Sequence, residues 1–147
     1  GLSRAKTLFF WSLGENAPIY FKMNIFRNAV SKFGIFLSLQ APTSNNVARY
    51  ILDEGESHLP FLFLKTDTTL IIDFIASELQ TTDVHYLISP GYDVIHHRLL
   101  KRGHKRLKFL HLSSFIIRTE EIEEIMLAQY PKVCKKFKIL KDVTSIS

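Results

Sequence analysis

Cysteine and long apolar runs are both scarce in this sequence. Cys134 is the single cysteine among 147 residues, so no disulfide can form within the chain and no CxxC motif is present. The scarcity of cysteine favours a reducing compartment. No apolar run approaches the roughly 20 residues of a membrane-spanning helix. Glu15 and Pro18 interrupt the short apolar run near the start, so we predict no signal peptide.

Glycine is scarce as well, and its placement excludes the common nucleotide-binding loops. The six glycines are scattered, and neither GxxxxGK nor GxGxxG occurs. A phosphate-binding loop needs clustered glycines, because several backbone N–H groups must face the phosphates. A GxSxG nucleophile elbow is also absent. We predict no catalytic residue and no cofactor, and a degenerate P-loop nucleotide kinase is the weakest alternative.

Apolar residues are abundant. They form 46% of the chain, and twelve of them are phenylalanine, which predicts one globular domain over residues 1–147. Residues 40–60 have the composition of a variable loop or insertion. Because the chain begins close to its first predicted strand, we expect a domain excised from a longer protein.

The balance of charge is mildly basic. The formal net charge is +5 and the pI is about 9.4. Such a chain can approach an anionic membrane surface, although a basic face that is simply solvated explains the charge as well. The aromatic residues near the start are more simply core than a stacking platform, so we predict no nucleic-acid partner.

The pattern of β-forming and helix-forming residues predicts an α/β fold. Strands are expected at residues 7–13, 17–21, 69–74, 107–112 and 135–140. Helices are expected from Asn24 to Gly34, after Asp83, over residues 92–102, and from Thr119 to Pro131. Residues 68–112 then form a strand, a crossover helix and a strand, which favours a parallel pair.

Two groups of residues are candidates for binding. Thr81, Thr82 and Asp83 precede the crossover helix, where backbone N–H groups can bind an anion or a phosphate placed on a threonine. Capping of the helix is the simpler explanation of these three residues. The second group is a basic surface on the crossover, formed by Arg98, Lys101, Arg102, Lys105 and Arg106.

Six histidines raise the question of a metal site. His96 and His97 are adjacent, so on a helix they point about 100° apart and cannot easily share one ion. Asp93 is the only carboxylate three or four residues from either of them. We predict no metal site.

Several short segments resemble the STAS domain, the module that anti-sigma factor antagonists share with the cytosolic tails of SulP-type anion transporters. Ala17–Phe21 is similar to the segment that opens the transporter versions. Leu70–Phe74 looks like the family's central strand, and Gln80–Leu87 looks like the start of the helix that follows it. Leu99–Leu112 looks like the end of the next helix together with its strand. Phe137–Ile146 looks like the final strand.

The resemblance implies a STAS-like mixed central β-sheet flanked by helices. It implies a non-catalytic regulatory domain on the cytosolic face of a membrane, docked on the transporter membrane domain or on a second STAS domain. Thr81 falls where the antagonists carry their phosphorylated serine, and Thr82 follows it, so a free-standing phospho-switch is the alternative. Gln80 and Asp83 depart from the family pattern, and the Asp83 carboxylate would repel an added phosphate.

Overall fold

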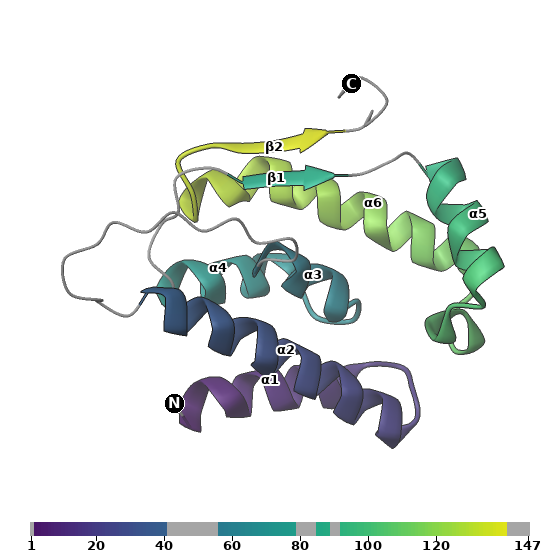
Figure 1. Cartoon of the computed structure of the whole chain (residues 1–147), viewed down its shortest axis with the longest axis horizontal. Coiled ribbons are helices and arrows are strands. Elements are labelled where there is room, and N and C mark those ends of the chain that lie inside the picture. Colours follow the sequence, from purple (N-terminus) through teal and green to yellow (C-terminus); the bar gives the residue numbers. More distant parts are fainter. Residues whose placement is uncertain (1, 41–55, 79–84, 89–91, 141–147) are drawn as a thin grey trace. The chain divides into compact units, whose positions relative to one another are not determined.

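The computed structural model describes residues 2–40, 56–78, 85–88 and 92–140 (Figure 1). The chain divides into two compact units, Gly1–Gln80 and Thr81–Ser147. The single domain expected over residues 1–147 stays a prediction. Most of the loop expected at residues 40–60, namely residues 41–55, lies outside the described residues. The end of that expected loop, from residue 56 onward, forms helical turns instead.

The described part of the N-terminal unit consists of helices joined by turns and contains no strand. Two long helices, α1 and α2, pack against each other, and shorter helical segments follow (Figure 1). Their bounds are α1 Leu2–Gly14, α2 Ile19–Gln40, η1 Glu56–His58, α3 Leu59–Leu62 and α4 Thr68–Glu78.

The strands predicted at residues 7–13 and 17–21 are wrong, because the first segment lies in α1 and the second covers the end of the turn before α2 and the first residues of α2. In α1 the buried residues Leu8 and Ser12 are four apart, which is helical spacing. The Ser12 hydroxyl donates to the Leu8 carbonyl at 2.8 Å, as in a helix turn. The helix expected over residues 24–34 is confirmed inside α2, but it does not end at Gly34.

The buried strand predicted at residues 69–74 is also wrong, because this segment is α4. The buried residues Thr68, Ile71, Ile72 and Ile75 recur at i, i+3, i+4 and i+7, the spacing of one helix face. Asp67 caps the helix: its Oδ1 accepts the Thr69 N–H at 2.8 Å. The tertiary packing of this face overrides the β propensity of its isoleucines.

Aromatic rings connect the helices of the N-terminal unit. The Trp11 ring of α1 lies 5.5 Å from the Phe63 ring and 5.2 Å from the Phe74 ring, edge to face in both pairs. Phe33 of α2 lies 5.2 Å from Phe74 of α4. The buried carboxylate of Glu15 accepts the Lys65 N–H at 2.9 Å and so fixes the turn after α1.

The described C-terminal unit contains a short parallel strand pair and two longer helices (Figure 1). The bounds are β1 His85–Ile88, α5 Tyr92–Arg102, η2 Lys105–Lys108, α6 Leu112–Gln129, η3 Tyr130–Lys132 and β2 Phe137–Leu140. His85 pairs with Phe137 and Ile88 with Leu140. The core includes Ile122, Met126, Tyr130, Val133 and Cys134.

Several predictions for this unit are confirmed. The helix over residues 92–102 is α5, and the last strand is β2. Gly103 ends α5 with a positive φ of 54°. Its N–H donates to the Leu100 carbonyl at 3.1 Å, and the N–H of His104 donates to the Leu99 carbonyl at 3.2 Å. These two bonds are the Schellman motif, which a glycine forms without steric cost.

Other predictions for this unit are wrong. The strand expected at residues 107–112 is a 3-10 turn that leads into α6. The helix expected to begin at Thr119 begins instead at Leu112, and the Thr119 hydroxyl donates to the Phe115 carbonyl inside it at 2.8 Å. Residues 85–88, expected in a helix after Asp83, form β1.

These findings overturn the predicted fold class. A mixed central β-sheet flanked by helices requires several strands, but helices dominate the described residues and their only sheet is the pair β1 and β2. The predicted βαβ unit at residues 68–112 is replaced by α4, β1 and α5. The parallel pair that does form joins segments about fifty residues apart in the sequence, with α5 and α6 between them.

Candidate functional site

Of the two groups of candidate binding residues, only the basic surface lies among the described residues. Thr81, Thr82 and Asp83 lie outside the described residues, so their role in anion binding or capping stays a prediction. The basic surface lies on α5 and η2. Arg98, Lys101 and Arg102 are exposed, and their spacing of three and four residues places them on one face of α5.

The other two members of the basic surface follow the turn at Gly103. Lys105 is exposed and Arg106 is half-buried, both in η2. The Schellman motif at Gly103 ends α5, so the five cations come from a helix face and the turn directly after it. Ile95 and Leu99 lie next to these cations on α5 and are half-buried, and α5 contacts α6.

Charge of the two signs is separated along the C-terminal unit. Residues 94–119 contain seven Lys and Arg side chains but no Asp or Glu. The acidic residues come immediately afterwards, at Glu120, Glu121, Glu123 and Glu124 of α6. Arg118 forms an ion pair with Glu121 at 3.1 Å where the two stretches meet. A field of one sign over this length attracts anions to α5 and η2.

His104 lies between the cations of α5 and those of η2. Burial, and then the positive charge of Arg106, lower the pKa of His104 below its usual 6.5. The folded unit therefore favours the neutral imidazole. The stability that this provides is fully present above the unfolded pKa of about 6.5 and is lost as the pH falls toward the folded pKa.

We expect His104→Gln to weaken the acid sensitivity of the C-terminal unit. The wild-type melting temperature should fall more than that of the variant between about pH 7.5 and pH 5.5, because only the wild type must protonate a partly buried imidazole. Circular dichroism at both pH values measures this difference. His97→Gln is the matched control, since the His97 side chain is exposed on α5. Equal responses of the two variants would contradict the prediction.

A second candidate surface lies in the N-terminal unit and was missed in the sequence. Among the residues that the structure describes, twelve large apolar side chains are exposed, and seven of them lie on α1 and α2: Leu2, Phe10, Ile19, Tyr20, Met23, Val30 and Ile35. Phe10 is 66% exposed, Ile19 63% and Tyr20 60%. Exposed apolar side chains gathered on neighbouring helices mark an interaction surface more often than isolated ones do.

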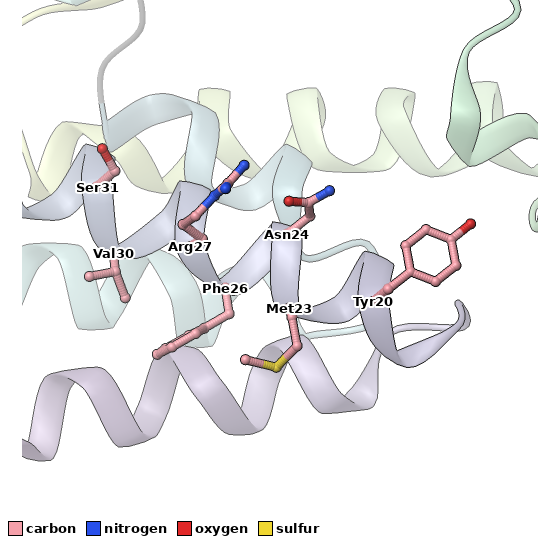
Figure 2. A pocket seen from close by; sticks show the side chains of 7 residues that line it. All are labelled: Tyr20, Met23, Asn24, Phe26, Arg27, Val30 and Ser31. Carbon is pink, nitrogen blue, oxygen red and sulfur yellow. The ribbon is translucent and has the colours of Figure 1, made fainter.

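Part of this surface is an open groove of about 560 Å³ along α2 (Figure 2). Its lining is Tyr20, Met23, Asn24, Phe26, Arg27, Val30 and Ser31. In Figure 2 the side chains of Met23, Phe26 and Val30 point toward α1, whereas Asn24 and Arg27 point to the other side of α2. The helix is thus apolar along its α1 side and polar along the opposite side.

The apolar side of α2 continues onto α1. The Phe26 ring lies 5.4 Å from the Phe9 ring, which in turn lies 6.1 Å from the Phe10 ring. The Lys22 ammonium donates to the Leu13 carbonyl at 2.6 Å and ties the two helices at their connection. We call this continuous surface, formed by Phe9, Phe10, Ile19, Met23, Phe26 and Val30, the hairpin face.

Helices α1 and α2 carry charge of only one sign. Their cations are Arg4, Lys6, Lys22, Arg27 and Lys32, and neither helix contains Asp or Glu. Arg4 forms an ion pair with Glu78 of α4. Lys6 and Arg27 are exposed. The hairpin face therefore belongs to two helices whose charged side chains are all cations.

Two further properties concern only the described part of the chain. Within it, no group of three or more His, Cys, Asp or Glu side chains could hold a metal ion. None of the helices described is long and apolar enough to cross a membrane.

Comparison with models of protein families, with curated proteins and with solved structures finds no match to this chain.

The resemblance to the STAS domain stays untested as an assignment of family. The mixed sheet that it implied is wrong, while the transporter tail and the phospho-switch that it implied stay predictions. The Ala17–Phe21 segment, which carried much of the resemblance, is not a strand: it covers the end of a turn and the first residues of α2.

Proposed function

We propose that this chain is a non-catalytic binding domain that attaches to the anionic surface of a membrane. The separation of charge in the C-terminal unit carries the proposal, because residues 94–119 hold seven cations and no carboxylate. Anionic lipid headgroups attract basic segments by about 1 kcal/mol for each Lys or Arg near the surface. Arg98, Lys101 and Arg102 share one exposed face of α5 and can approach the headgroups together.

Nucleic acid presents phosphates too, but a membrane fits the surroundings of the cations better. Val94 is exposed on the same face of α5 as Arg98 and Lys101. An apolar side chain beside cations can enter the headgroup region of a bilayer, as on amphipathic helices that lie in the interface. Such a side chain adds little to contacts with a phosphate backbone. We therefore favour lipid headgroups as the source of the anions.

The test is flotation with vesicles of about 30% phosphatidylserine in phosphatidylcholine, at about 50 mM salt. We expect the wild type to bind these vesicles more tightly than vesicles of pure phosphatidylcholine. The variant Arg98→Gln, Lys101→Gln, Arg102→Gln should bind on the order of 100-fold more weakly, since three charges at about 1 kcal/mol each are lost.

The matched control removes three cations from the other end of the same unit. Lys132→Gln, Lys136→Gln and Lys138→Gln change the net charge equally and replace exposed side chains. If this control loses as much binding as the α5 variant, net charge and not the basic surface attracts the chain. Binding to a single-stranded RNA oligonucleotide without binding to the vesicles would make nucleic acid the partner and overturn the proposal.

A further inference from the structure

We infer that the helical hairpin of α1 and α2 inserts its apolar face into the interface of the bilayer and serves as the anchor of the domain. This deepens the membrane attachment proposed above and rests on it. The two surfaces act by different physics. The basic surface on α5 and η2 attracts headgroups through charge, whereas the hairpin face gains its binding energy from buried apolar area.

The composition of the hairpin is that of a helix pair lying in a membrane interface. Such helices combine an apolar side of Phe, Leu or Trp with a polar side rich in Lys and Arg. Here Phe10, Ile19 and Met23 are exposed on the apolar side, and Arg27 projects from the other side of α2. Tyr20, 60% exposed, has the apolar ring and polar hydroxyl that suit the headgroup level.

Charge identifies the occupant of the hairpin face. Neither α1 nor α2 contains a carboxylate, and together they contain five Lys and Arg side chains. A second copy of this chain would bring the same positive charge to the interface and would be repelled. An anionic bilayer offers opposite charge to the exposed Lys6 and Arg27 and hydrocarbon to the exposed apolar side chains of the hairpin face.

The exposed side chains of the hairpin face lie outside the core of the N-terminal unit. The residues that α2 buries include Ile25, Ala29 and Phe33, and none of them is among the exposed side chains of the hairpin face. Trp11 faces Phe63 and Phe74 instead of the hairpin face. Insertion of the exposed side chains therefore requires no unfolding of the unit, and Trp11 fluorescence reports the integrity of the core separately.

The test repeats flotation at about 300 mM salt, where screening weakens attraction between charges but not apolar burial. We expect the wild type to remain on vesicles of about 30% phosphatidylserine. The variant Phe10→Gln, Ile19→Gln, Met23→Gln should bind on the order of 100-fold more weakly, because three side chains lose their transfer to hydrocarbon. Unchanged Trp11 emission would show that its core is intact.

The matched control removes exposed apolar side chains from the C-terminal unit through Leu100→Gln, Ile117→Gln and Leu127→Gln. It should bind at high salt as the wild type does. An equal loss in the control, or wild-type binding by the hairpin variant, overturns the insertion. Wild-type binding that occurs only at about 50 mM salt supports the basic surface but overturns the anchor. Failure of the wild type to bind at either salt overturns both proposals.

A probe at the hairpin face gives an independent readout. In a Cys134→Ser background, Met23→Cys carries an environment-sensitive fluorophore, and Lys65→Cys carries it at an exposed turn outside the hairpin. We expect a blue shift with vesicles at Met23 but not at Lys65. Equal shifts at the two positions, or none at Met23, would overturn the insertion even if the chain floats.

Discussion

Replacement of Ile71 by alanine should lower the free energy of unfolding of the N-terminal unit by about 2–5 kcal/mol, and Ile72→Ala should do the same. Both side chains are fully buried in α4. Leu70→Ala should change it by no more than about 0.5 kcal/mol, because Leu70 is 56% exposed. Urea titration measures all three changes.

Trp11 is a suitable probe for this titration. It is the single tryptophan, and its ring lies 5.2 Å from Phe74 in the middle of α4. Its emission should therefore shift when α4 separates from α1. Leu70→Ala is the internal control, since it shortens an apolar side chain in the same helix without opening a cavity.

The same three variants decide between a helix and a strand. In a strand Leu70 and Ile72 point to the same face, because side chains alternate. A strand would therefore make Leu70→Ala and Ile72→Ala similarly costly. In a helix Ile71 and Ile72 can both lie on the buried stripe with Ile75, while Leu70 faces away. Equal losses for Leu70→Ala and Ile72→Ala would contradict α4.

The sequence contained signals for the helix α4, but the β propensity of the same residues was a stronger signal for a strand. An apolar run of this length fits a buried strand and a buried helix equally well by periodicity. Its isoleucines and threonines favour a strand by propensity, and that preference decided the prediction. Asp67 is a good N-cap two residues before Thr69, and with the spacing of Thr68, Ile71 and Ile75 it would have favoured the helix.

Residues that end a helix gave correct predictions, because their local conformation allows few alternatives. Gly103 ends α5 through its positive φ, which few other residues adopt. Pro131 follows the end of α6 closely, as expected. The long-range pairing of β1 with β2 was not predictable in this way, because a four-residue strand at residues 85–88 has no turn signal that sets its partner.

The two candidate surfaces also differ in how well the sequence predicts them. Clustered cations are exposed in nearly every fold, so the basic surface at residues 98–106 was visible in the sequence. The hairpin face was not, because an exposed Met23 or Ile19 has the same side-chain chemistry as the buried Ile25 of the same helix. Only the packing of α2 on α1 distinguishes the two sides. The absence of Asp and Glu from both helices was the available signal.

Tyr130 is the second position at which we expect a substitution to have a large effect, through its packing in the C-terminal unit. Tyr130 is fully buried after the end of α6, and its ring lies 4.7 Å from the Phe137 ring of β2. Its carbonyl accepts the Val133 N–H at 2.8 Å and the Cys134 N–H at 3.2 Å. The residue thus joins α6, the turn that follows it and β2 at a single point. Cys134, 1% exposed beside it, is the only cysteine and reports when this region opens.

Tyr130→Ala should raise the rate at which a thiol reagent modifies Cys134 by on the order of 100- to 1,000-fold. Truncation of a large buried aromatic side chain costs about 3–5 kcal/mol, and this cost shifts the equilibrium toward the open state in which the thiol is accessible. Leu127→Ala, at a side chain 50% exposed on α6, is the control and should change the rate only a few-fold. Equal rates for the wild type and Tyr130→Ala would mean that Cys134 reacts without opening of this core, and that Tyr130 does not hold α6 and β2 together.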